Sequence, residues 1–226
     1  MPKASDNDSR FLLLGEALAS HATEAAHRDD RLAVEGDSAQ AAVAVILRAT
    51  PGLEVLLIKR AHSERDPWSG HMAFPGGRLE DGDPHLRAAA VRETLEEVGV
   101  DLADAEILGQ LDDMEGHHAA DTRMLISAFA FLVRGTPDVS PNHEVRQAFW
   151  FPVGDLLDPD RHVDYPMERF GVGSYPGILV GLPDRHVVWG LTYKFLEVFL
   201  HTIGHPLPDR WGDLPEFIRP PHRQKS

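Results

Sequence analysis

The sequence predicts an α/β protein with one main domain. Apolar or alternating runs of strand length are interspersed with two segments of helical periodicity. A chain of 226 residues, 42% of them hydrophobic, is also large enough to bury one sizeable core. The expected strands cover residues 41–47, 54–59, 106–111, 124–133 and 144–151.

The first expected helix follows a glycine loop and ends before Gly99. Asp83 is suited to the N-cap, and Pro84 to the first helical position, where no backbone N–H is needed. The alanines at 88–90 favour a helix and allow it to pack closely on a sheet. Gly99 fits the C′ position. The expected apolar stripe consists of Val91, Leu95 and Val98.

The second expected helix, over residues 187–203, closes the main domain, which covers 40–204. Residues 1–39 form a polar extension with an expected short helix near 11–18. Residues 205–226 form a proline-rich arm. This arm can pack on its own subunit or on a second copy, so a homodimer is one of two alternatives left open.

Three carboxylates follow the glycine loop within one helical turn. Glu93, Glu96 and Glu97 share one helix face, where like charges destabilise an isolated helix. Mg²⁺ or Mn²⁺ would offset these charges, since both prefer oxygen ligands. Gly76 and Gly77 leave the loop backbone free to bring a carbonyl to the same cation. The alternative is a solvated acidic helix end.

Basic side chains and a histidine adjoin this cluster in the sequence. Arg92 can brace a carboxylate or form an ordinary surface ion pair. Lys59 and Arg60 end a strand, where they can contact a pyrophosphate or lie on a solvated edge. His71 comes shortly before the glycine loop and is a further candidate for contact with the ligand.

Two segments are candidates for the walls of a substrate pocket. Residues 115–118 contain His117 and His118, which can contact phosphate or a metal, or can simply be solvated on a polar loop. Residues 158–183 form a long, irregular region with several aromatic side chains, which can stack on a base or pack in the core.

The segment from Gly77 to Val100 resembles the Nudix box, usually written G-x5-E-x7-R-E-U-x-E-E-x-G-U, where U is a bulky aliphatic residue. Asp83 stands at the first Glu, eight residues separate it from Arg92, and Thr94 replaces the aliphatic. With the aspartate and the longer spacer, the segment resembles the box of the coenzyme A pyrophosphatase branch of the Nudix hydrolase superfamily. Two further stretches resemble that branch, namely residues 56–77 and 188–192. The resemblance covers roughly residues 40–203.

The resemblance implies an α/β/α sandwich with a mixed central sheet and a loop-helix-loop at the metal site. It implies metal binding by Glu93, Glu96, Glu97 and the Gly77 carbonyl, and hydrolysis of a nucleoside diphosphate linked to another group. The proton of the attacking water would pass to Glu93 or to Glu144. The context of Glu144, from Pro141 to Pro152, is similar to the segment that carries a catalytic carboxylate in this superfamily; the alternative is a surface glutamate.

The resemblance implies coenzyme A or an acyl derivative as substrate, with 3′,5′-ADP and phosphopantetheine as products. Trp68 and His71 depart from the branch, which usually has His at the first position and Glu or Gln at the second. ADP-ribose, dinucleotides and nucleoside polyphosphates therefore remain alternatives. A noncatalytic nucleotide-binding regulator is disfavoured because the box glutamates are all present. The candidate substrate-binding residues are Lys59, Arg60, Trp68, His71 and Gly76.

The composition argues against several partners. A net charge of −14 disfavours a nucleic-acid surface, which needs clustered Lys and Arg. No run of 18 apolar residues and no secretory leader is present, so we expect no membrane contact. The lack of cysteine rules out disulfides and thiolate chemistry, and it fits the cytoplasmic location that we expect.

Overall fold

The computed structural model describes residues 39–49, 52–63, 68–119, 122–166, 174–183 and 185–211. The expected helix near residues 11–18 and the arm beyond residue 211 lie outside these ranges, and so do the side chains of His117 and His118. In the part of the chain that the structure describes, no helix is long and apolar enough to cross a membrane.

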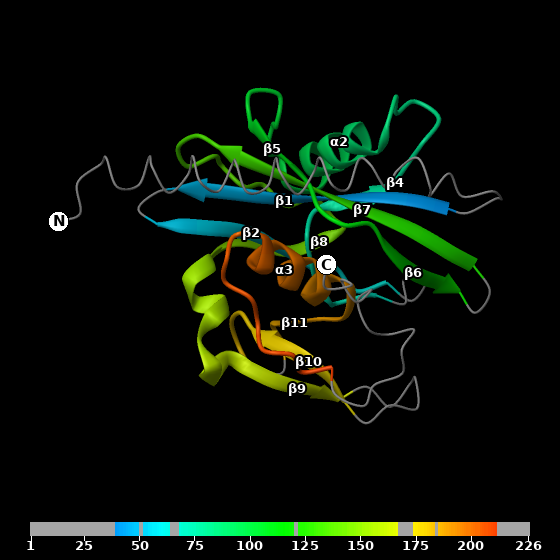
Figure 1. Cartoon of the computed structure of the whole chain (residues 1–226). Coiled ribbons are helices and arrows are strands. Elements are labelled where there is room, and N and C mark those ends of the chain that lie inside the picture. Colours follow the sequence, from blue (N-terminus) through cyan, green and yellow to red (C-terminus); the bar gives the residue numbers. More distant parts are fainter. Residues whose placement is uncertain are drawn as a thin grey trace, which may run out of the picture.

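Within the described residues, eight strands form one mixed sheet (Figure 1). Its main path runs β3-β2-β1-β7-β5, while β4 pairs with β1, β6 with β7 and β8 with β2. The β1–β7 pair is parallel and the other pairs are antiparallel. The strands are β1 (Ala39–Ala49), β2 (Leu53–Arg60), β3 (Met72–Ala73), β4 (Gly76–Arg78), β5 (Glu106–Gln110), β6 (Met114–Ala119), β7 (Thr122–Val133) and β8 (Val145–Pro152).

The continuous apolar run of β1 is explained by its central position. Ala44 and Ile46 face one hydrophobic cluster, and Val45 and Leu47 face the other, because successive side chains of a strand point to opposite faces. A strand covered on both faces therefore needs apolar residues at every position.

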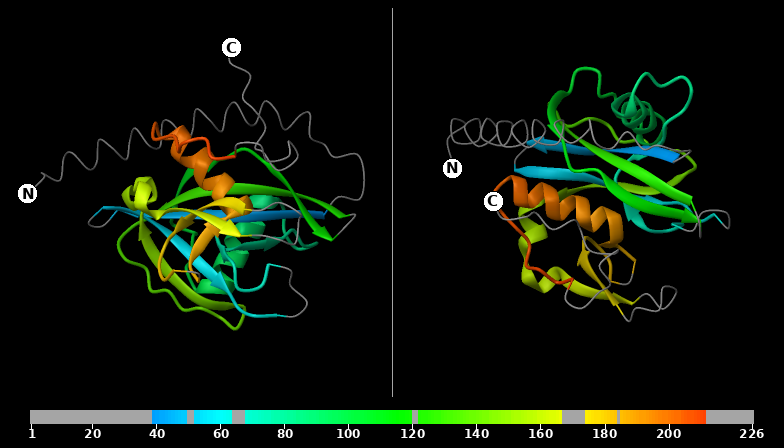
Figure 2. Two further views of the ribbon diagram at one scale, coloured as in Figure 1. Left: turned by 90° about the horizontal axis from the view of Figure 1, so that it is seen from below. Right: turned by 45° about the vertical axis from the view of Figure 1, so that its right-hand side comes forward.

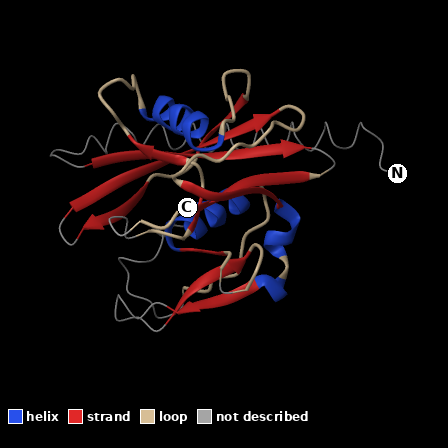
Figure 3. Ribbon diagram, turned by 180° about the vertical axis from the view of Figure 1, so that it is seen from behind, coloured by secondary structure: helices blue, strands red, loops and turns tan. Residues whose placement is uncertain are grey.

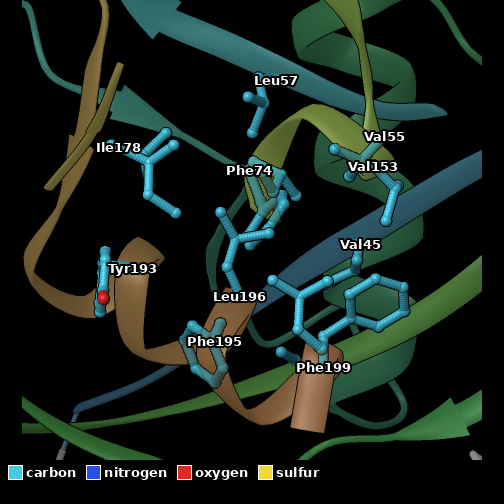
Figure 4. Packing of buried hydrophobic residues seen from close by; sticks show 14 of the residues in the cluster. Val45, Val55, Leu57, Phe74, Val153, Ile178, Tyr193, Phe195, Leu196 and Phe199 are labelled. Atoms are coloured by element: carbon cyan, nitrogen blue, oxygen red, sulfur yellow. The ribbon is translucent and has the colours of Figure 1, made fainter. Parts of the chain in front are cut away.

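In the chain segments that the structure describes, one helix covers each face of this sheet, which confirms the expected α/β/α sandwich. Helix α2 (Leu86–Val98) lies above the sheet in Figure 1, and α3 (Gly190–Thr202) lies below it. Figure 3 shows the same layers from behind. Figure 4 shows the lower core, where Phe199 of α3 lies near Val45 of β1. Full burial of such a side chain contributes roughly 1.5–3 kcal/mol.

A second sheet of three antiparallel strands lies beyond α3 (Figure 2). Its strands are β9 (His162–Pro166), β10 (Ser174–Leu179) and β11 (Val187–Trp189), and two short 3₁₀ helices, η1 (Val153–Leu157) and η2 (Pro159–Arg161), lead into it. The expectation of an irregular region over 158–183 is therefore wrong. Pro176 and Gly177 weaken the strand pattern of β10, since both residues are depleted in strands.

The C-terminal helix begins later than expected, because residues 187–189 are a strand and the helix starts at Gly190. The described start of the arm packs on its own chain. Leu207 and Trp211 are buried, and the guanidinium of Arg210 donates to the backbone carbonyl of Val163. A contact with a second copy is not needed to cover this segment.

Helix α2 begins two residues later than expected. His85 is the N-cap, and its Nδ1 accepts a hydrogen bond from the N–H of Ala88 at 3.0 Å. The expectation that Asp83 caps this helix and that Pro84 opens it is wrong. The carboxylate of Asp83 instead accepts a hydrogen bond from the N–H of Glu80. Both of its oxygens also accept hydrogen bonds from the guanidinium of Arg92. The expected end is confirmed, since Gly99 has φ 70° and donates to Leu95.

The buried face of α2 also differs from the expected stripe. Leu95 is 51% exposed, whereas Thr94 and Glu97 are buried with Ala90 and Val98. Small alanines bring the helix close to the sheet, so its larger aliphatic residue is left outside. The inward face of α2 therefore carries a carboxylate toward the glycine loop.

Candidate active site

The glycine loop is held against β1 at a point where only glycine fits. Gly76 pairs with Val43, and Gly77 with Ala42. Gly76 has φ 151°, and a Cβ there would overlap the carbonyl oxygen of Ala42 and the Cα of Val43. A Cβ on Gly77 would overlap the carboxylate of Glu93. Two successive glycines thus let the loop pass between β1 and the acidic residues of α2.

Glu97 is the most buried of the three helix carboxylates. Its side chain accepts the N–H of Gly76 at 2.9 Å, and the residue is only 2% exposed. Burial raises the pKa of Glu97 to about 7, although the hydrogen bond from Gly76 and the charge of Arg60 oppose this. The negative charges of Glu93 and Glu144 raise it further. A carboxylate in this position gains from a nearby cation.

Glu93 lies beside Gly77 and shares this environment. Burial raises its pKa, the hydrogen bond from Arg92 opposes the rise, and the charges of Glu96 and Glu144 add to it. Glu144 lies on the turn before β8, where its side chain is 56% exposed. Its negative charge contributes to the raised pKa of both Glu93 and Glu97.

The position of Glu144 follows from backbone contacts with the end of α2. The N–H of Asn142 donates to the carbonyl of Glu97 at 2.9 Å, and the N–H of Ser140 donates to that of Val98. The carbonyl of Glu144 in turn accepts from Ala61, just beyond β2. These bonds fix the turn that carries Glu144 between α2 and β2. Glu144 itself follows Glu97 by 47 positions in the sequence.

Arg92 braces the acidic cluster. Its Nη1 donates to Glu93 at 2.9 Å and to Glu96 at 3.3 Å. Its Nε and Nη2 donate to Asp83, and Nη2 also donates to the carbonyl of Arg78. These contacts, led by the hydrogen bond to Asp83, raise the pKa of Arg92, so it stays charged. Asp83, one of the positions that depart from the Nudix box, thus anchors the arginine that orients Glu93 and Glu96.

The chemistry of this donor set fits a hard divalent cation. Glu93, Glu97 and Glu144 supply carboxylate oxygens, and their mutual repulsion would be relieved by positive charge. Among the described residues, no three such groups already surround a single point at ligand distance. Glu96 is 54% exposed and can turn toward an ion. Binding would therefore require side-chain rotation, including movement of Glu93 or Glu96 relative to Arg92.

A pocket of about 240 Å³ adjoins the glycine loop on the α3 side of the sheet. Four of the expected substrate-binding residues line it, namely Arg60, Trp68, His71 and Gly76. Lys59 does not line it, because its Nζ donates to the backbone carbonyl of Arg185 at 2.9 Å. The fold thus separates two basic residues that are adjacent in the sequence.

Trp189 organises the aromatic side of this pocket. The ring of His71 meets it edge-on at 4.9 Å, Trp68 lies 6.4 Å away, and Tyr165 stacks on it at 4.7 Å. Trp189 was not among the expected site residues. The sequence feature that could have pointed to Trp189 is the resemblance of residues 188–192 to the coenzyme A pyrophosphatase branch. Ile126, Leu191 and Phe195 also line the pocket, and their sequence pattern predicts only core packing.

Known proteins resemble this chain in both sequence and fold. The NUDIX domain family matches residues 38–169, more than half of the chain. NudL of Cronobacter sakazakii, an uncharacterized Nudix hydrolase, is 28% identical over 72% of this chain and 80% of its own length. The uncharacterized protein C14C4.10c of Schizosaccharomyces pombe is 40% identical over 47% of this chain, which spans about a third (34%) of that relative.

Among solved structures, a MutT/nudix family protein from Enterococcus faecalis has a TM-score of 0.51 at 17% identity. The likeness covers 79% of this chain and 72% of that one, and it concerns the fold alone. The family match and the Nudix hydrolase relatives support an enzyme that hydrolyses pyrophosphate bonds in nucleoside diphosphate derivatives. Because the match covers more than half of its residues, the chain belongs to the NUDIX domain family.

Proposed function

We propose that this Nudix hydrolase cleaves the pyrophosphate bond of coenzyme A or an acyl-coenzyme A, releasing 3′,5′-ADP and phosphopantetheine or its acyl derivative. The observation that carries the hydrolytic part is the position of Glu97. This carboxylate is buried beside Gly76, and the charges of Glu93 and Glu144 act on it. Such a cluster is suited to binding a cation next to a loop that can receive phosphate oxygens.

The proposed ligands of Mg²⁺ or Mn²⁺ are Glu93, Glu96 and Glu97, with the carbonyl oxygen of Gly77. When bound, the ion would neutralise pyrophosphate oxygens and lower the pKa of an attacking water. Arg92 orients Glu93 and Glu96 through its hydrogen bonds. Arg60, whose charge reaches Glu97 and which lines the pocket, is suited to contact the pyrophosphate.

A carboxylate accepts the proton of the attacking water. Glu93 and Glu144 are both suited to this role, because each lies close enough to influence the pKa of Glu97. The new P–O bond forms to the water oxygen while the bridging P–O bond breaks, so two phosphorylated products leave. Glu97 is the more buried group and is proposed as a ligand instead of the base.

The choice of coenzyme A rests on the resemblance of residues 56–77, 83–92 and 188–192 to the coenzyme A pyrophosphatase branch. In the structure, the first and last of these stretches meet in the pocket, where Trp68 and His71 pack against Trp189. Hydrolysis of ADP-ribose, dinucleotides or nucleoside polyphosphates is the alternative, since Trp68 and His71 depart from that branch. A homodimer and a cytoplasmic location remain predictions.

Product analysis tests this proposal. The full chain is incubated with Mg²⁺ and, separately, coenzyme A, hexanoyl-coenzyme A, ADP-ribose and diadenosine tetraphosphate, and the products are identified by mass spectrometry. We expect coenzyme A to yield 3′,5′-ADP and phosphopantetheine. We also expect coenzyme A and hexanoyl-coenzyme A to have higher kcat/KM values than ADP-ribose and diadenosine tetraphosphate. Preferred cleavage of ADP-ribose or the dinucleotide would assign the alternative substrate. Binding of a nucleotide without any cleavage would indicate a regulator.

A further inference from the structure

The pocket beside the glycine loop is too small for a whole nucleotide derivative. Its volume is about 240 Å³, below the roughly 300–1,000 Å³ of pockets that enclose a drug-sized ligand. It therefore receives one part of a substrate whose pyrophosphate lies at the loop. Which part it receives is decided by the chemistry of the walls.

The walls are mostly apolar, and their polar groups lie near the loop. No carboxylate lines the pocket among the described residues. Arg78 follows Gly77 directly, and the charge of Arg60 reaches Glu97, so both cations lie on the pyrophosphate side. The hydroxyl of Thr192 already donates to the carbonyl of Met72. A nucleobase would find few partners for its polar edge here, whereas an apolar arm loses none.

The floor of the pocket crosses the sheet away from the loop. Ala41 of β1 lies between Arg78 of β4 and Ile126 of β7 in the strand pairing. On the far side of β7, Gly116 of β6 pairs with Met124, another pocket residue. With neighbouring strands about 4.8 Å apart, the two spacings from β4 to β7, the last strand that lines the pocket, make about 10 Å. This length suits an extended chain better than a compact ring.

Gly116 limits the far end of this floor. A Cβ there would come within 2.9 Å of Cδ1 of Leu191 and 3.1 Å of Cδ1 of Ile126. Both atoms are the ends of flexible side chains, and both side chains line the pocket. A single added methyl group would therefore displace these two pocket-lining side chains without touching the glycine loop or the carboxylates.

We infer that this pocket binds the apolar end of the substrate's non-nucleotide arm, such as the acyl chain of an acylated pantetheine, and that Gly116 sets the length of chain that it accepts. The inference rests on the proposed pyrophosphatase function, of which it specifies the substrate class. The nucleotide half then lies outside the pocket, on the solvent side of the loop. Leu191 is the matching determinant from α3, since it closes the pocket opposite the sheet.

The test compares hexanoyl-coenzyme A with acetyl-coenzyme A. Gly116→Ala should lower the ratio of their kcat/KM values by about tenfold, because a few methylene groups in an apolar pocket discriminate by this amount or more. Leu191→Ala enlarges the pocket and should raise the same ratio. Gly154→Ala is the matched control, because a Cβ at Gly154 meets no atom within 4 Å, and it should leave the ratio unchanged.

Calorimetric Kd values for the two thioesters give their binding preference without relying on turnover. The Kd values therefore separate this inference from the proposed function. Ratios that agree within threefold in all variants, by kinetics and by binding, would overturn it. If Gly116→Ala fails to fold by circular dichroism, Leu191→Ala decides alone: a raised ratio supports the pocket assignment, and an unchanged ratio overturns it. Absence of hydrolysis by the wild type, with chain-length-dependent binding, would refute only the enzymatic proposal.

Discussion

The backbone N–H of Gly76 donates a 2.9 Å hydrogen bond to the carboxylate of Glu97, so one bond joins the glycine loop to the buried face of α2. Glu97 is buried, whereas the side chain of its neighbour Glu96 is exposed. The hydrogen bond also places a carboxylate with a raised pKa next to the position proposed for the pyrophosphate.

Glu97→Gln should reduce kcat at least about a hundredfold, the loss typical of removing one electrostatic stabiliser of a transition state. The fold should persist, because an amide oxygen can still accept the N–H of Gly76. Steady-state kinetics with saturating Mg²⁺ provide the measurement, and Glu106→Gln, an exposed change on β5, is the control. A loss below threefold would reduce Glu97 to a structural role.

The metal-free chain should lose stability as the pH rises from about 4.5 to about 7. The folded pKa of Glu97 lies above its ordinary value, so the folded state holds a proton that the unfolded state has released in this window. Relative to Glu97→Gln, the free energy of unfolding should fall by about 2–3 kcal/mol, since one pKa unit corresponds to about 1.4 kcal/mol.

Urea unfolding in EDTA at several pH values measures this difference. If the free energy of unfolding changes with pH in the same way for the wild type and Glu97→Gln, the folded chain does not hold Glu97 in its neutral form. The comparison with the variant removes contributions from other titrating groups that both proteins share.

Gly76→Ala should destabilise the fold by about 1–3 kcal/mol. The position has a positive φ, and the new Cβ would overlap backbone atoms of Ala42 and Val43, which cannot move as a flexible side chain can. Gly52→Ala is the control, because a Cβ there meets no atom within 4 Å. Thermal unfolding measures both, and equal melting temperatures would contradict the described loop geometry.

Glu144→Gln should slow turnover and reveal which role Glu144 has. If Glu144 accepts the proton, the pH profile of kcat should shift toward alkaline values while the affinity for Mn²⁺ stays the same. If it binds the metal, the affinity for Mn²⁺ should fall instead. Unchanged turnover, with Glu106→Gln as the exposed control, would remove Glu144 from the site.

The sequence predicted the elements whose pattern is local. The strand over residues 41–47, which lies within β1, and the glycine at the end of α2 are both confirmed. The strand β10 escaped prediction because Pro176 and Gly177 are tolerated there only through pairing with β9 and β11. The start of α2 was misplaced because Asp83, a good N-cap residue, is used by Arg92.

The site was predictable where the Nudix box is contiguous, and less so where the fold assembles it. Glu93, Glu96 and Glu97 lie on one helix, so their spacing already places them together. The packing of Trp189 on His71 and of Leu191 near Gly116 depends on contacts between distant segments. No local pattern encodes such contacts, so the pocket walls could not be derived from the sequence in the same way.

In the proposed mechanism, the glutamates of α2 hold a divalent cation that hydrolysis of the pyrophosphate requires. The direct measurement is the release of 3′,5′-ADP from coenzyme A in the presence of excess EDTA, followed by addition of Mg²⁺ or Mn²⁺ beyond the chelator. We predict that activity disappears in EDTA and returns with either ion. Undiminished turnover in EDTA would contradict the proposed role of the glutamate cluster.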